Sequence, residues 1–276
     1  MDATSIINSI NTIAEKIFKS VEKDVFKNLD ILVNISPKIL KEEPLNKIFT
    51  EDLNSNIILL ISSFIILFAI SYIVSRMILL YNGEQQTSVF KFILRVGVCT
   101  IFSISSFYLM ETLLNINSLF TSVIANIGED ITHEKICFNS LREIVIDLNK
   151  YMGEDFLSLD GMIKGVISFG AVTLLLHFSI RYTTVIFLIL ISPITIMFAS
   201  SDITYDIFSS WLKMLLINLF IQNIVVIIII IPLGFKKINT VMFKIVLVGV
   251  IYLLYRINGF SREILGNISR RVVRRR

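Results

Sequence analysis

Apolar residues dominate five stretches of this chain, and charged residues concentrate between them. Reading windows of about 19 residues gives clear stretches at 57–74, around 92–110, at 165–201 and at 214–235, and a weaker one at 238–255 that contains Lys244. A helix needs about 20 apolar residues to cross a hydrocarbon core of about 30 Å. The pattern therefore predicts an all-α, polytopic membrane helical bundle with about five transmembrane helices.

The stretch 165–201 decides the number of membrane spans, because it could cross the membrane once or twice. Its 37 residues contain one charged side chain, Arg181, and one proline, Pro193. Two spans would need a reversal near Arg181 and Tyr182, yet the nearest glycine and proline are Gly170 and Pro193, so no turn residue lies there. We expect a single net crossing bent near Pro193. Two crossings in this stretch would give the alternative, six spans.

Composition agrees with the membrane class. Hydrophobic residues make up 54% of the chain and charged residues 17%, with a mean hydropathy of +0.76. A soluble domain has about a quarter of its residues charged.

Seven apolar residues near the N-terminus recur every three or four positions: Ile6, Ile10, Ile13, Ile17, Val21, Val25 and Leu29. This spacing predicts an amphipathic helix. Lysines and acidic residues alternate on its polar positions, which argues against simple attraction to anionic lipid. We interpret it as a lid packed on the protein's own membrane-facing end. A subunit contact or an interfacial helix is the alternative.

Loop charges predict the orientation. Residues 76–95 carry three basic residues against one acid, the tail 256–276 carries seven against one, and the loop 111–160 carries three against nine. Basic loops stay inside, so we expect the tail in the cytoplasm and the 111–160 loop and the N-terminus outside. Five crossings satisfy this and six do not. The predicted regions are an extracytoplasmic N-terminal region (1–55), a transmembrane domain (56–255) and a basic cytoplasmic tail (256–276).

The 111–160 loop is itself expected to be helical. An apolar stripe continues the second span up to Gly128, a residue typical of a helix C-cap, and a second short helix is expected to end near Gly153. The stripe residues are Leu113, Ile116, Phe120, Val123 and Ile127, and those of the second helix are Leu141, Ile144, Val145 and Leu148. We expect an acidic helical cap, the alternative being a solvated connector.

Candidate chemistry is sparse. His133 and Cys137 could share a helix face, but a zinc site needs three or four ligands, so we expect no metal, no cofactor and no enzyme activity. Cys99 lies in the second span and reads as a small packing residue. Five arginines between Arg270 and Arg276 read as a topology anchor near anionic lipid, with contact to nucleic acid as the alternative.

Polar side chains within the apolar stretches are therefore the main functional candidates. An ionised group in the membrane usually faces a bundle interior or water, which singles out Arg181, with His177 one helical turn before it. Gln222 and Asn223 supply a second polar face, and Ser103, Ser105 and Ser106 a third. We interpret these as a seam at a channel or subunit interface. Alternatively, Arg181 reaches the membrane surface from a shallow position and the amides join helices.

One family resemblance follows from the order of features. A long apolar stretch with one basic residue leads to Ser192-Pro193-Ile194, a short polar link, and Ile207-Phe208-Ser209-Ser210-Trp211-Leu212 at the start of the next span. Over residues 55–255 this order resembles the TrbL family of polytopic inner-membrane subunits of type IV secretion systems. The Ile-, Asn- and Lys-rich composition suggests an AT-rich bacterium, so the expected setting is conjugation in a Gram-positive bacterium.

The resemblance implies a non-enzymatic channel or scaffold subunit in the bacterial cell membrane that helps move a DNA–protein substrate. It implies a homo-oligomer, other secretion-system subunits and ATPases as partners, contact with the transferred DNA, and no small-molecule substrate. Pro193 would break a helix to open a cavity, while Trp211, with Phe208 beside it, would anchor the span at the interface. The alternatives are a sporulation channel component resembling stage III sporulation protein AE and a small-solute transporter, which would carry an internal repeat with matched broken helices.

Overall fold

The computed structural model describes residues 24–41, 53–81, 89–143, 159–201, 204–235 and 242–257, together with the single residues 9, 12, 13 and 16. The described parts confirm the all-α class. The elements are α2 (Phe26–Val33), η2 (Pro37–Lys41), α4 (Leu53–Tyr81), α5 (Val89–Ile104), α6 (Ser106–Thr132), α8 (Leu159–Leu190), α9 (Ser192–Met197), η4 (Phe198–Ser200) and α10 (Tyr205–Phe235). Residues 138–143 and 242–257 are also helical.

Three of the described helices are long and apolar enough to cross a membrane. The qualifying segments are Ile61–Ile78, Gly161–Leu190 and Tyr205–Phe235, and the bent pair Phe90–Ile104 and Ser106–Thr132 would make a fourth if it forms one broken span. The described part of the chain thus has three or four candidate spans.

The long apolar stretch runs through Arg181 without a turn. Helix α8 continues to Leu190, Ile191 interrupts it, and α9 starts at Ser192 with Pro193 in its first turn. Proline is tolerated there because the first N–H groups of a helix have no intrahelical acceptor, whereas inside a helix it would remove a bond. The interruption therefore lies beside the proline and not at Arg181.

The second expected span, 92–110, is two helices in the structure. α5 ends at Ile104 and α6 begins at Ser106, with a bend of 66° between them. α6 does not end at Gly128, as the sequence suggested, but at Thr132. His133 follows with a φ of 58° and donates its N–H to the carbonyl of Glu129 at 2.7 Å, so His133 provides the left-handed C-terminal position.

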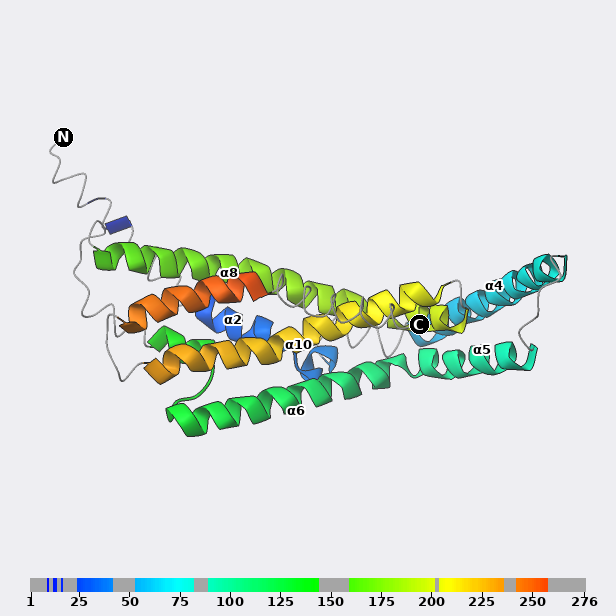
Figure 1. Ribbon diagram of the computed structural model, residues 1–276, viewed down its shortest axis with the longest axis horizontal. Helices are drawn as coiled ribbons and strands as arrows, with labels where there is room; N and C mark the ends of the chain where they lie inside the picture. The colour runs from blue at the N-terminus through cyan, green and yellow to red at the C-terminus, as the bar shows by residue number, and fades with distance from the viewer. Residues whose placement is uncertain are drawn as a thin grey trace. The chain divides into compact units, whose positions relative to one another are not determined.

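The chain forms two compact units. Unit 1 comprises residues up to Ile35, 117–183 and 217 onward, and unit 2 comprises 36–116 and 184–216. In unit 1, α2 packs against residues of α8, α10, the 136–141 segment and the C-terminal helical residues 242–257 (Figure 1). Its core includes Leu29, Phe138, Phe178, Val225 and Leu254, all 2% exposed or less.

Contacts within unit 1 give the directions of its helices. Gly170 lies against Ile251 and His177 against Tyr255, so α8 and residues 242–257 run the same way. Thr121 and Gly128 on α6 meet Asn223 and Ile230 on α10, so α6 and α10 also run the same way as each other.

Gly128 is a packing residue in the structure. A Cβ there would lie 2.6 Å from Cδ1 of Ile230 and 3.0 Å from Cγ1 of Ile136. The apolar stripe that was expected to pack instead lies largely on the exposed side of α6, with Phe120, Val123 and Ile127 each more than half exposed, while Asn117 and Thr121 point inward.

In unit 2, α4, α5, α9 and η4 contact one another. α4 and α5 lie side by side, with the rings of Tyr72 and Phe92 stacked 4.0 Å apart (Figure 1). Cys99 is buried between Ile61, Phe68 and Met197, so it packs as a small apolar residue.

Most of the expected N-terminal amphipathic helix lies outside the described residues. Of its apolar positions, Val25 and Leu29 belong to the unit 1 core, whereas Ile13 is 59% exposed. In the expected second loop helix Leu141 is buried, and residues 144–158, which include the expected end at Gly153, lie outside the described parts.

Candidate functional site

Arg181 is the largest fully buried side chain of the described chain, with 2% of its surface exposed. Its Nε donates to the carbonyl oxygen of Asn218 at 2.8 Å and its Nη1 to the carbonyl oxygen of Val33 at 3.3 Å. Its Nη2 has no hydrogen-bond partner among the residues that the structure describes. The guanidinium therefore lies buried inside unit 1.

Both acceptors of Arg181 are neutral main-chain oxygens. Val33 is the last residue of α2, and the final carbonyls of a helix carry partial negative charge and lack intrahelical donors. A cation at that position satisfies one of these carbonyls. In the described residues the guanidinium is thus held by dipoles and makes no ion pair with a carboxylate.

Gln222 is buried on α10 and binds the same end of α2. Its Oε1 accepts the N–H of Ile35 at 3.2 Å and the Nδ2–H of Asn117 at 3.3 Å. Two buried donors therefore share one amide oxygen. Arg181 and Gln222, which lie on different helices, both contact the short stretch between Val33 and Ile35.

Asn223 extends this arrangement along α6. Its Nδ2 donates to Oδ1 of Asn117 at 2.9 Å, and its Oδ1 lies 2.7 Å from the hydroxyl of Thr121, which donates to it. We call Arg181, Gln222, Asn223, Asn117 and Thr121 the polar seam. All five are at most 7% exposed, so the seam is an internal network of unit 1.

Three members of the seam were predicted from the sequence, whereas Asn117 and Thr121 were not. The available signal was their spacing of four residues, which puts both on one face of a helix, opposite the apolar stripe. The contribution of α2 was also missed, because Val33 and Ile35 bind through main-chain atoms that any residue possesses.

His177 contacts aromatic rings. Its ring lies 5.8 Å from that of Tyr255 and 6.5 Å from that of Phe178, and its side chain is half-buried. One turn before Arg181, it thus lies against the C-terminal helical residues 242–257. None of the seam's hydrogen bonds described above involves it.

Pro193, Phe208 and Trp211 lie in unit 2. The indole N–H of Trp211 donates to the carbonyl of Leu188 at 3.0 Å, and the hydroxyl of Ser103 donates to the carbonyl of Pro193. Leu188 belongs to the last turn of α8, where carbonyls lack intrahelical donors. Trp211 is 5% exposed and its ring lies 5.9 Å from that of Phe208. The indole therefore caps the end of α8 from inside the unit, and the interfacial anchor expected of Trp211 stays a prediction.

Asp30 joins α2 to the segment after α6. Its two carboxylate oxygens accept the N–H groups of Phe138 and Asn139 at 2.7 and 3.0 Å. Burial raises the pKa of this carboxyl, and the two hydrogen bonds and the charge of Lys135 partly offset that rise. No pattern in the sequence predicts this contact.

His133 and Cys137 have separate structural roles. His133 ends α6, and the sulfur of Cys137 lies 3.1 Å from the hydroxyl oxygen of Ser140. In the part of the chain that the structure describes, no group of three or more His, Cys, Asp or Glu side chains could hold a metal ion.

Comparisons with protein-family models, with curated proteins and with solved structures find no match to this chain.

Proposed function

We propose that this chain is a channel or scaffold subunit of a conjugative type IV secretion system, which contributes to the movement of a DNA–protein substrate across the cell membrane. The observation that carries this proposal is the polar seam. Helices of membrane-spanning length enclose a cation that bonds to main-chain carbonyls and three amides that bond to one another. Such groups are costly in hydrocarbon and tend to mark pathways.

The TrbL-like order of features gives further support. The two halves of that motif, the Pro193 segment and the Trp211 segment, belong to the same unit. There Trp211 binds the end of the helix that Pro193 interrupts. In this proposal Pro193 and Trp211 fix the turn between α8 and α10, and Phe208 packs against the indole.

For the topology we propose five spans with the N-terminus outside and the C-terminus in the cytoplasm. The spans are α4, the bent pair α5–α6, α8, α10 and residues 242–257. The helix directions in unit 1 support it, because α6 and α10 would run outward and α8 and 242–257 inward. The charges of the loops decide which ends of these helices lie outside.

We further propose that the outer segment begins after Thr132 and not at residue 111. Asn117 and Thr121 bond to residues 222 and 223, which lie near the middle of α10. If α10 spans the membrane, this part of α6 lies at the same depth. The exposed face of Phe120, Val123 and Ile127 would then meet lipid.

The partners follow from the same proposal. Several copies of the chain would assemble with other secretion-system subunits and would be energised by separate ATPases, and the conduit would contact the transferred DNA. The chain itself would carry out no reaction and would need no cofactor.

The test is genetic. An in-frame deletion in the donor should abolish transfer while leaving nicking by the relaxase intact, and the wild-type gene in trans should restore transfer. A gene for Arg181→Gln should restore transfer poorly, whereas one for Arg256→Gln, an exposed arginine, should restore it fully. Normal transfer from the deletion strain would refute the proposal.

One observation favours a second function, a small-solute transporter. Two interrupted helices meet in unit 2, where Ser103, just before the α5–α6 bend, donates to Pro193, just after the α8–α9 interruption. Paired broken helices are typical of transporter binding sites. Substrate uptake by the purified protein in liposomes, lost on changing Ser103 to Ala, would select this function.

A further inference from the structure

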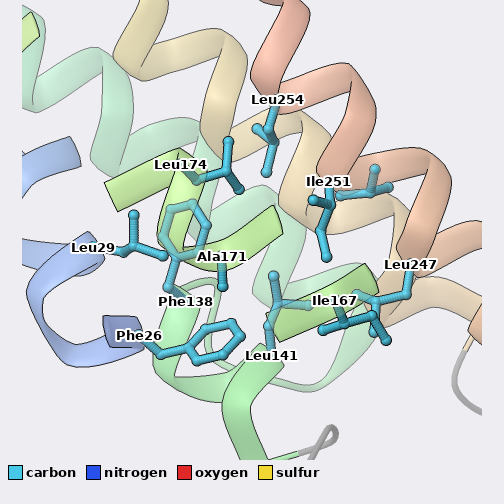
Figure 2. Close-up of a pocket in the computed structure, with 11 residues that line it drawn as sticks. Phe26, Leu29, Phe138, Leu141, Ile167, Ala171, Leu174, Leu247, Ile251 and Leu254 are labelled. Atoms are coloured by element: carbon cyan, nitrogen blue, oxygen red, sulfur yellow. The ribbon is translucent and has the colours of Figure 1, made fainter. Parts of the chain in front are cut away.

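The N-terminal segment 24–35 buries one face in unit 1, whereas Ile31 and Asn34 on its other face are exposed. Leu29, Val33 and Ile35 are each 2% exposed or less. Figure 2 shows Phe26 and Leu29 pointing at Phe138, Ala171 and Leu174, with Leu254 and Ile251 beyond them. The space left between these side chains is about 10 Å³, about the smallest volume that holds one water molecule. The buried face of the segment therefore packs closely against α8 and the C-terminal helical residues.

The end of this segment reaches the second half of α8 and the middle of α10. The carbonyl of Val33 accepts from Arg181 on α8, and the N–H of Ile35 donates to Gln222 near the middle of α10. Phe26, seven residues earlier, lies beside Ile167 near the start of α8. The segment thus enters at the end of unit 1 where α8 begins and runs inward along α8.

The groups that hold the segment recognise a polypeptide by its main chain. The guanidinium of Arg181 binds the carbonyl of Val33, which also accepts the N–H of Ile35 at 3.0 Å in a turn around Asn34, and the amide oxygen of Gln222 accepts that same N–H. Helix ends offer carbonyls without intrahelical donors in any sequence. Arg181 is 2% exposed and its Nη2 has no partner in the described parts of the chain, which leaves one further donor for an acceptor.

The entrance side adds a second attachment. Asp30 accepts two main-chain N–H groups from Phe138 and Asn139, where residues 138–143 begin a helix whose first N–H groups need acceptors. The segment is therefore held by hydrogen bonds at two levels and by apolar contacts between them.

We propose that the interior of unit 1 is a binding site for the end of a helical polypeptide, and that residues 24–35 occupy it as a plug that closes the polar seam. This inference rests on the proposed conduit function. Withdrawal of the segment removes the Val33 carbonyl from Arg181 and the Ile35 N–H from Gln222. It uncovers a cation and amides of the seam, which suit small anions and the main chain of an entering polypeptide.

The test compares two substitutions on the same helix in the full-length protein. Leu29→Asp places a carboxylate among apolar side chains, while Ile31→Asp changes a residue that is 56% exposed. In liposomes loaded with chloride, Leu29→Asp should raise efflux at least about tenfold over wild type, because an unpaired buried charge is strongly disfavoured. Ile31→Asp should leave efflux at the wild-type level. A synthetic peptide of residues 24–35 should lower the efflux of Leu29→Asp again.

Equal efflux from the two variants, or no effect of the peptide on a leaking Leu29→Asp protein, would overturn the proposal. If Leu29→Asp fails to fold, cysteine labelling at position 29 tests the proposal instead. In a protein with Leu29→Cys and with Cys99 and Cys137 replaced by Ala, the new thiol should resist labelling by a water-soluble maleimide in vesicles. Adding Arg181→Gln should increase that labelling severalfold. Unchanged labelling would overturn the proposal. Purified protein is used throughout, so the result is independent of the conjugation test, and either one can fail alone.

Discussion

The hydrogen bond between Thr121 and Asn223 gives the sharpest energetic test of the polar seam. Thr121→Val removes one hydroxyl and keeps the side-chain volume. Asn223→Leu removes the acceptor of that hydroxyl, 2.7 Å away, and the donor to Asn117, 2.9 Å away. The two substitutions should therefore be coupled, because each removes one half of the same bond.

The expected coupling is about 1–1.5 kcal/mol. Side-chain hydrogen bonds between membrane helices average about 0.6 kcal/mol and reach about 1.7 kcal/mol, and this one is short and fully buried. The Thr121 hydroxyl also lies 2.9 Å from the carbonyl of Asn117. Because that second acceptor compensates Thr121 when Asn223 is lost, the coupling should remain below the maximum.

The assay is equilibrium unfolding of the four proteins of the cycle in mixed micelles at increasing dodecyl sulfate. Trp211 is the single tryptophan of the chain, so its fluorescence reports one site. The control cycle replaces Ser122, an exposed neighbour that bonds to the carbonyl of Leu119, by Ala and should give no coupling with Asn223→Leu. A Thr121 coupling no larger than the Ser122 value would refute the reasoning.

Three further outcomes are expected. Gly128→Ala should lower stability by about 1–2 kcal/mol, since overpacking against Ile230 and Ile136 outweighs the helix propensity gained, whereas Gly249→Ala, with nothing within 4 Å of its Cβ, should be neutral or stabilising; thermal unfolding in detergent separates them. The fluorescence of Trp211 should peak at short wavelength and resist quenching by iodide, and an emission typical of the lipid–water interface would count against the buried position. Trp211→Phe should lower the free energy of unfolding by about 1 kcal/mol, because the Leu188 carbonyl loses its donor. The pKa of Asp30 in the folded protein is above its ordinary value of 3.8, so the folded state binds the proton more tightly and stability should fall as pH rises through that raised pKa. Asp30→Asn should flatten this part of the curve of stability against pH, measured between pH 3.5 and 7. An unchanged curve would exclude Asp30 as the source of the pH dependence.

The helices themselves could be predicted from the sequence because long apolar runs and one proline determine them locally. α8 passes through Arg181 since nothing near that residue ends a helix, and the interruption lies beside Pro193. The bend at Ser105 could not be predicted in this way. It has no proline or glycine, and the hydroxyl of the nearby Ser103 binds the carbonyl of Pro193, ninety positions away in the sequence.

The errors on α6 have one physical cause. A glycine followed by acidic residues reads locally as a helix end, but Gly128 is where α10 approaches closely, and α6 continues to His133. The apolar stripe was assumed to face inward, as it does in water-soluble proteins. In the structure the inward face carries Asn117 and Thr121, whose partners lie on another helix.

The polar seam could be predicted only in part. Arg181, Gln222 and Asn223 are conspicuous because they interrupt apolar runs. Their partners Val33 and Ile35 are apolar residues that contribute an O atom and an N–H of the main chain, so no sequence pattern marks them. The burial of α2 beside the seam therefore came from tertiary packing.

The claim on which this account depends is that the polar seam lies at membrane depth. A nitroxide label at Phe120, which is 62% exposed and adjacent to Thr121, tests it in a protein with Cys99 and Cys137 replaced and reconstituted in bilayers. The account predicts that collisions with oxygen, which concentrates in hydrocarbon, exceed those with a water-soluble nickel complex. Greater accessibility to the nickel complex would place this part of α6 in water and contradict the account.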